Sequence, residues 1–201
     1  MDLTPLSFCM GSTNKDAKNS TGVFWDLEDY PIPDHLDPAT VVENIKLVLK
    51  SNGYTGDVFV WAYLPGGKTF SKHSVQEYKD AGITTITVTE EKYRRLHRML
   101  IDFQVWSMDN RAIYGVGPNI LVITKDMVGK KTSFIRLLGI FEEADYHVLW
   151  ALPDDDTIEA PSCVKAKWHW RFLSGGGDPS VGDKSKTREE DICHNTDGQS
   201  M

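Results

Sequence analysis

Short apolar runs alternate along the chain with segments in which apolar residues recur every three or four positions. The runs are rich in Val, Ile, Phe and Trp and are bounded by Gly, Asn or Asp, which is typical of strands buried on both faces. The segments with the three- or four-residue spacing are predicted to be amphipathic helices. An Asp followed by a Pro marks the start of one helix, and a Thr followed by a Glu marks the start of another. The predicted strands are 22–27, 57–63, 83–88, 119–124 and 146–152, and the predicted helices are 37–52, 71–80, 89–110, 132–143 and 159–173.

This alternation of strands and helices predicts an α/β fold with a mainly parallel, five-stranded sheet. Because such a sheet is covered by helices on both faces, we expect a three-layer sandwich. The domain is expected to span 21–173. The flanking segments 1–20 and 174–201 are polar and have no apolar period, so we predict that both are disordered.

Charge and composition exclude few classes of function. The chain has 201 residues, with 22 basic and 29 acidic side chains and a formal net charge of −7, which does not favour bulk electrostatic binding of nucleic acid. No apolar run reaches the roughly 18 residues of a membrane span, so none is expected. Three scattered cysteines without zinc-ligand spacing indicate a reducing compartment.

Four aspartates stand where a parallel sheet would bring them together. Asp26 and Asp29 follow the first predicted strand, Asp126 follows the fourth, and Asp102 lies on the long helix beside its apolar stripe. Ligands of open α/β sheets gather at the carboxyl ends of the strands. An oxygen-rich group there suits Mg²⁺ or Mn²⁺ and metal-assisted hydrolysis of a phosphodiester.

Simpler readings compete with this metal site. An Asp after a strand is more often a turn former, Asp102 could pair with Arg98 one helical turn away, and Asp126 could pair with Lys125 or Lys130. Basic side chains could contact phosphates or form a solvated face, and the six tryptophans fit packing better than base stacking. The basic residues concerned are Arg94, Arg95, Arg98, Lys130 and Lys131.

Several segments in the same order resemble NYN domains of the PIN-like nuclease superfamily. FWDLEDYPIP (24–33) is similar to the W-D-x-E-N-C-P-x-P motif that ends the family's first strand. LIDFQVWSMDN (100–110) resembles its Asp-bearing helix, and NILVITKD (119–126) resembles its strand ending in S-G-D. YHVLWALP (146–153) and WHWRFLSGGG (168–177) resemble its last segments. The likeness is greatest to the plant branch related to the meiosis regulator and mRNA stability factor (limkain-type) proteins.

The resemblance implies a PIN-like fold and an Mg²⁺- or Mn²⁺-dependent endoribonuclease with a role in gene expression or mRNA stability. It implies single-stranded RNA as substrate and a cytoplasmic, peroxisome-associated location, with the nucleus left open. A separate, weaker hypothesis is that the domain only builds an assembly with a protein partner through its tails. Asp26, Asp29, Asp102 and Asp126 match the catalytic and metal-binding positions. Lys125, Lys130, Lys131 and Arg98 would contact the nucleic acid.

Departures from the motifs support a second hypothesis. The family's Asn is Asp29 here, and its S-G-D-x-D is replaced by Thr-Lys-Asp-Met-Val at 124–128, which lacks the second Asp. Leu96-His97 stands where the family carries an Asp-Lys pair. The alternative is therefore a catalytically degenerate NYN domain that binds RNA or a protein partner without cleavage.

Overall fold

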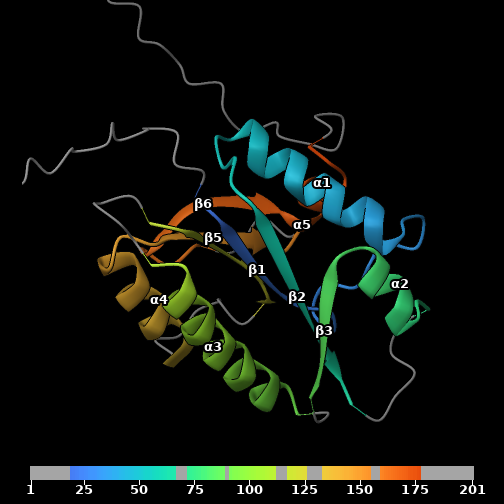
Figure 1. The fold of residues 1–201 in the computed structure, drawn as a ribbon, viewed down its shortest axis with the longest axis horizontal. Helices are drawn as coiled ribbons and strands as arrows, with labels where there is room; N and C mark the ends of the chain where they lie inside the picture. The colour runs from blue at the N-terminus through green and yellow to red at the C-terminus, as the bar shows by residue number, and fades with distance from the viewer. Residues whose placement is uncertain are drawn as a thin grey trace, which may run out of the picture.

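A computed structural model describes residues 19–66, 72–88, 91–111, 117–125, 133–154 and 159–177. Strands and helices alternate through most of these residues, as the ribbon in Figure 1 shows. The strands are β1 (Thr21–Asp26), β2 (Val58–Pro65), β3 (Ile83–Val88), β4 (Asn119–Ile123), β5 (His147–Leu152) and β6 (Val164–His169). The helices are α1 (Pro38–Ser51), α2 (Val75–Asp80), α3 (Lys92–Asp109), α4 (Ser133–Glu143) and α5 (Trp170–Ser174).

The strands form one sheet in the order β3-β2-β1-β4-β5-β6, and every pairing is parallel. The α/β prediction is confirmed, but the described sheet has six strands and the prediction of five was wrong. The predicted helix 159–173 is instead strand β6 followed by the short helix α5. Strand β6 lies at the sheet edge, where half-buried residues alternate with the exposed Lys165 and Lys167, so its apolar content is low.

Two hydrophobic cores lie on opposite faces of the sheet, which confirms the three layers. One core packs α1, α2 and α5 against the sheet around Trp25 and Ile45. The other packs α3 and α4 around Phe24 and Phe103, and the two helices lie side by side in Figure 1. The tryptophans pack as expected: Trp25, Trp106, Trp150 and Trp170 are buried, and Trp61 and Trp168 are half-buried.

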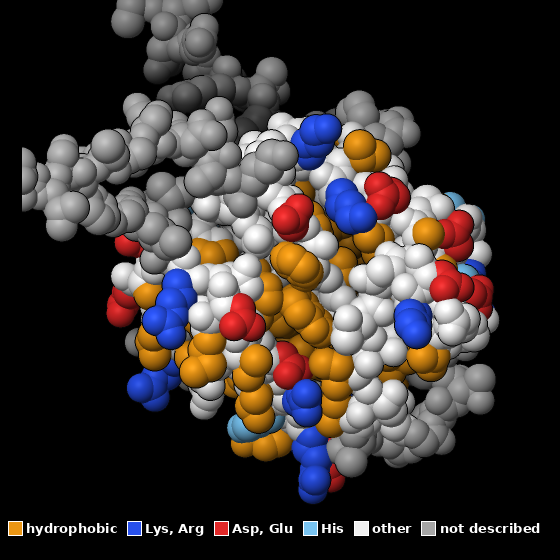
Figure 2. All heavy atoms as spheres, viewed as in Figure 1, with side chains coloured by type: hydrophobic (Ala, Val, Ile, Leu, Met, Phe, Trp, Pro, Cys, Tyr) orange, Lys and Arg blue, Asp and Glu red, His pale blue; other side chains and the backbone are white. Residues whose placement is uncertain are grey.

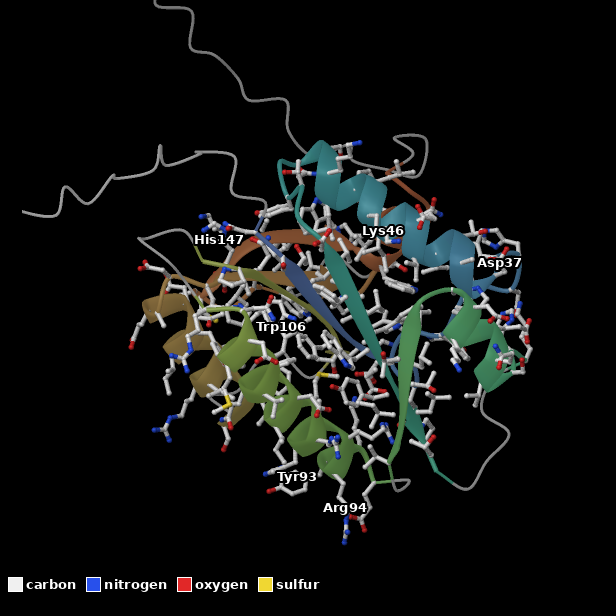
Figure 3. All side chains as sticks on the ribbon, viewed as in Figure 1. Asp37, Lys46, Tyr93, Arg94, Trp106 and His147 are labelled. Atoms are coloured by element: carbon white, nitrogen blue, oxygen red, sulfur yellow. The ribbon has the colours of Figure 1, made fainter. Side chains whose placement is uncertain are left out.

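Helix α3 places one stripe of side chains against the sheet. Arg95, Met99, Phe103 and Trp106 recur at helical spacing and are its buried residues. Figure 3 shows Trp106 between the helix and the sheet, whereas Tyr93 projects away from them. A charged residue, Arg95, therefore belongs to the buried stripe of α3.

The order of the strands reverses between β1 and β4. From β1 the chain crosses through α1 to β2 on one side, whereas β4 lies on the other side of β1. Loops that leave neighbouring strands in opposite directions open a crevice at the carboxyl edge, which is where α/β sheets bind ligands. None of the helices in the described part of the chain has the length and apolar character needed to cross a bilayer.

Candidate functional site

Strand β1 ends in a tight turn that Asp26 organises. Asp26 Oδ1 accepts a hydrogen bond from the Glu28 backbone N–H at 3.0 Å, and the Asp26 carbonyl accepts one from Tyr30 at 3.1 Å. The Trp25 indole donates to the Tyr30 carbonyl at 2.7 Å. Asp26 is therefore a turn former, and the same turn brings Asp29 to the end of β4.

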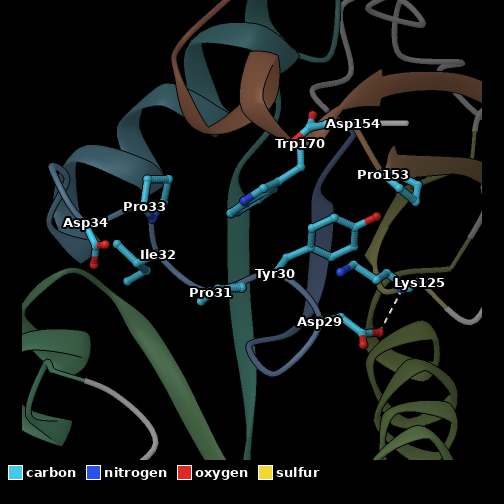
Figure 4. Close-up of a pocket in the computed structure, with 10 residues that line it drawn as sticks. All are labelled: Asp29, Tyr30, Pro31, Ile32, Pro33, Asp34, Lys125, Pro153, Asp154 and Trp170. Carbon is cyan, nitrogen blue, oxygen red and sulfur yellow. Dashed lines mark hydrogen bonds between the residues drawn. The ribbon is translucent and has the colours of Figure 1, made fainter. Parts of the chain in front are cut away.

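Asp29 joins the ends of β1 and β4. Its Oδ2 accepts hydrogen bonds from the Thr124 hydroxyl and the Lys125 backbone N–H, each at 2.8 Å. Its Oδ1 accepts from the Lys92 ammonium of α3 at 2.7 Å. Figure 4 shows the Asp29 carboxylate directed at Lys125 across the gap between the strands. Both Asp29 oxygens are thus held by donors of the chain itself.

Asp26 and Arg95 form a buried ion pair. Both side chains are fully buried, and Arg95 Nε lies 3.4 Å from the Asp26 carboxylate. The Arg95 guanidinium also bonds the carboxylate of Glu28, whose side chain is 42% exposed. A cation from α3 therefore lies between two carboxylates of the β1 turn.

The protonation of Asp26 reflects this environment. The pKa of Asp26 is raised from the ordinary 3.8 to about 6, first by burial and second by the nearby negative charge of Asp29. The positive charges of Arg95 and Lys92 act in the opposite direction. Burial dominates, so Asp26 binds a proton more readily than an ordinary aspartate despite its ion pair.

Asp102 belongs to a separate group of contacts on the same face of the sheet. Its carboxylate accepts a hydrogen bond from the Tyr63 hydroxyl at 2.9 Å and pairs with Arg98 at 3.0 Å. Burial and the charge of Asp102 raise the pKa of Tyr63, so this hydroxyl stays a donor. Of the two readings of Asp102, the structure shows the pairing with Arg98.

The described donors do not fit an Mg²⁺ or Mn²⁺ centre. These ions need several carboxylate or carbonyl oxygens that face a common point. Among the residues that the structure describes, no three acidic, His or Cys side chains are grouped closely enough to hold a metal. The oxygens of Asp26, Asp29 and Asp102 instead face Arg95, Lys92 and Arg98.

The predicted site residues therefore divide into three sets. The first, Asp26 and Asp29, lies at the carboxyl edge of β1 as expected. The second set comprises Asp102, Arg98 and Lys125. Arg98 binds Asp102, and the Lys125 ammonium lies 5.5 Å from the centre of the Tyr30 ring. The third lies outside the described residues and comprises Asp126, Lys130 and Lys131.

Sequence reasoning missed the internal cations of this site. The sequence predicts that Arg94, Arg95 and Arg98 contact phosphates or form a solvated helix face, and both predictions are wrong for Arg95 because its side chain is fully buried. Its position four residues before Met99 was the available signal, since residues at that spacing share a helix face. The pairing of Lys92 with Asp29 spans 63 residues and left no local signal.

No family model matches the sequence, and neither does any curated protein. The relation to NYN domains accordingly stays a prediction.

Proposed function

We propose that this chain is an NYN-type, PIN-like domain that binds single-stranded RNA at the carboxyl edge of its sheet without cutting it. Its role would lie in the control of gene expression or mRNA stability. The proposal combines the sequence resemblance with the position of Asp26, Asp29 and Lys125 at the reversal of strand order. RNA would approach this edge through its phosphates.

We infer the absence of cleavage from one observation, the burial of Arg95 against Asp26 and Glu28. In a metal-dependent nuclease, a divalent cation relieves repulsion between neighbouring carboxylates and supplies the charge that polarises the phosphate. Here Arg95 and Lys92 already supply positive charge to Asp26 and Asp29. A metal would have to displace a fully buried guanidinium, which would leave an arginine without its partners.

Among the described residues, the face of the molecule shown in Figure 2 has no broad basic surface. On the face shown in Figure 2, the Lys and Arg side chains stand apart, separated by apolar and acidic groups. Nucleic-acid affinity grows with the number of phosphates neutralised. We therefore expect modest affinity and a short contact that includes Lys125.

The second candidate is the Mg²⁺- or Mn²⁺-dependent endoribonuclease. One observation favours it: Asp29 raises the pKa of Asp26, which is the mutual repulsion that a divalent cation relieves. Asp126 follows β4 in the sequence and is an additional acidic residue for such a site. In this form the domain would hydrolyse RNA.

One experiment separates the two candidates. The intact chain is titrated into a fluorescein-labelled single-stranded RNA, in EDTA and in Mn²⁺, with anisotropy reporting binding and a denaturing gel reporting cleavage. We expect binding in EDTA that weakens as salt rises, and intact RNA in Mn²⁺. Lys125→Ala should weaken binding, whereas the exposed Lys79→Ala at the end of α2 should not.

Two results would contradict the proposal. If no RNA binds at any salt concentration, the RNA-binding function is wrong. If Mn²⁺-dependent cleavage is seen and is lost in Asp26→Asn but kept in the exposed Asp109→Asn, the endoribonuclease is the correct candidate.

A further inference from the structure

Helix α3 exposes a row of apolar side chains on the side that faces away from the sheet. Four of the eight exposed large apolar side chains in the described part of the chain belong to this helix. Ile101, Val105 and Met108 recur at helical spacing and are 53%, 55% and 65% exposed, and Tyr93 extends the row toward the helix start. Single exposed apolar residues are ordinary, but a row of them on one helix marks an interaction surface. We call these four residues the α3 ridge.

The sheet beside the α3 ridge is incompletely covered. Phe59 on β2 is 45% exposed, and Trp61 on β2 and Ile86 and Val88 on β3 are half-buried. Trp61 stacks on Phe24 of β1 with the ring centroids 5.0 Å apart, and both belong to the core on the α3 side of the sheet. Figure 2 shows apolar groups exposed over β2 beside α3. We call Phe59, Trp61, Ile86 and Val88 the open sheet face.

The α3 ridge and the open sheet face lie next to each other. The Asp102 carboxylate of α3 accepts a hydrogen bond from the Tyr63 hydroxyl of β2 at 2.9 Å, so this flank of the helix faces β2. Val105 follows Asp102 by three residues and therefore stands where the ridge meets the open sheet face. An apolar helix surface and an apolar sheet surface are the two kinds of surface that pack together in the layers of an α/β fold.

The charges around these two surfaces are balanced within the chain. Arg94 pairs with Glu91 at 2.8 Å, and Arg98 pairs with Asp102 at 3.0 Å. A surface that binds nucleic acid presents unbalanced positive charge to the phosphates, and one that binds an anionic bilayer does the same. The balance on α3 instead favours a partner that is apolar where it makes contact.

We infer that a second copy of this chain covers both surfaces, in a two-fold symmetric dimer in which the α3 ridge of each copy packs on the open sheet face of the other. A two-fold interface uses the same patch on both copies, so each contact occurs twice. One copy supplies both the helical surface and the sheet surface that the other requires. The helix of the second copy then completes the layer over β2 and β3. This inference does not depend on RNA binding.

The first measurement is the mass of the intact chain by sedimentation equilibrium over a wide range of protein concentrations. The monomer has a mass of 22.7 kDa, and we expect the mass to approach twice this value at high concentration and to fall on dilution. Because dimerisation stabilises only the folded chain, the midpoint of thermal unfolding should rise with protein concentration.

Charge substitutions test which surfaces meet. Val105→Glu on the ridge and Phe59→Lys on the open sheet face should each weaken dimerisation by about tenfold or more, because each places a charge in an apolar contact. Leu47→Glu is the matched control and should leave the dimer unchanged, since Leu47 is 56% exposed on α1, which packs on the opposite face of the sheet. Circular dichroism checks that each variant is folded.

Mixing the two charge variants tests the arrangement itself. In a dimer of Val105→Glu with Phe59→Lys, one of the two contacts is native and the other places Glu opposite Lys. An equimolar mixture should therefore recover dimers that neither variant forms alone.

Four results would overturn the inference. The first is the monomer mass at every concentration, and the second is a dimer that persists in both charge variants, because another surface would then join the copies. The third is a mixture that recovers no dimer, which would show that the ridge does not pack on the open sheet face. The fourth is a monomer whose affinity for single-stranded RNA falls in Phe59→Ala but not in Leu47→Glu, which would assign the open sheet face to nucleobases.

Discussion

A guanidinium removed from water loses its hydration, and its partners must replace those hydrogen bonds. Arg95 is fully buried and meets the buried carboxylate of Asp26 and the half-exposed carboxylate of Glu28. A buried ion pair of this kind adds little net stability, but removing one partner leaves the other uncompensated. At the residue scale, Arg95 and Asp26 are therefore expected to depend on each other.

Arg95→Met should lower the free energy of unfolding by about 3–5 kcal/mol, because the Asp26 carboxylate would lose its buried partner. Combining it with Asp26→Asn should recover part of that loss, since the buried charge is then gone as well. Urea denaturation of the two single variants and the double variant measures this coupling. Additive losses would show that the two residues do not interact.

The raised pKa of Asp26 predicts a pH dependence of stability. Its ordinary pKa is 3.8 and its pKa in the folded protein is about 6, so between these values the folded protein binds this proton more tightly than the unfolded chain. The contribution of Asp26 to the free energy of unfolding therefore falls as pH rises from about 4 to about 6.

Asp26→Asn carries no such proton and should gain stability relative to the unsubstituted protein by roughly 2–3 kcal/mol across that range. Urea unfolding of both proteins at intervals between pH 4 and pH 7 measures the difference, with Asp109→Asn as an exposed control. A difference that stays constant, or that changes in the opposite direction, would show that folding does not raise the pKa of Asp26.

At the scale of the elements, helix α3 shows which structural features can be predicted from the sequence and which cannot. The apolar spacing of Met99 and Phe103 predicts which face of the helix is buried, and Arg95 falls on that face by the same spacing. What Arg95 meets there depends on Asp26, 69 residues earlier in the chain. Local periodicity contains no such contact, so the positions of Asp26 and Asp29 were predictable and their pairing with Arg95 and Lys92 was not.

Strand β6 illustrates a second limit. Its sequence, VKAKWH, alternates charged and apolar residues and precedes the mainly apolar WRFL of α5, so the two together resemble one helical pattern. The alternation in fact belongs to an edge strand with one neighbour. A short strand at a sheet edge has too few buried positions for its two-residue period to be recognised in the sequence.

Substitution of two glycines tests how closely the backbone packs just before β4. A Cβ on Gly117, just before β4, would lie 1.8 Å from the backbone carbonyl oxygen of Asp145, whereas a Cβ on Gly139 in α4 would meet nothing within 4 Å. Gly117→Ala should therefore destabilise the protein by about 1–3 kcal/mol or more. Gly139→Ala should stabilise it by about 0.5–1 kcal/mol because Ala favours the helix.

Thermal or urea unfolding of both variants measures the contrast. Equal effects of the two substitutions would contradict the close approach of the Gly117 and Asp145 backbones at the start of β4.

At the scale of the whole molecule, the strand order decides which side chains meet. The reversal between β1 and β4 brings Asp29 to Thr124 at the carboxyl edge of the sheet. Helix α3 crosses from β3 to β4 on one face and carries Lys92 and Arg95 to the same edge. The topology thus brings two of the four expected aspartates, Asp26 and Asp29, to one edge and places the positive charges of Lys92 and Arg95 beside them.

The most direct test of this account is a calorimetric titration of Mn²⁺ into the intact protein at neutral pH. If Arg95 and Lys92 neutralise the carboxylates, we expect no stoichiometric Mn²⁺ site, and Asp26→Asn and Asp109→Asn should give the same weak signal as the unsubstituted protein. Saturable binding of Mn²⁺ that is lost in Asp26→Asn and kept in Asp109→Asn would contradict the account.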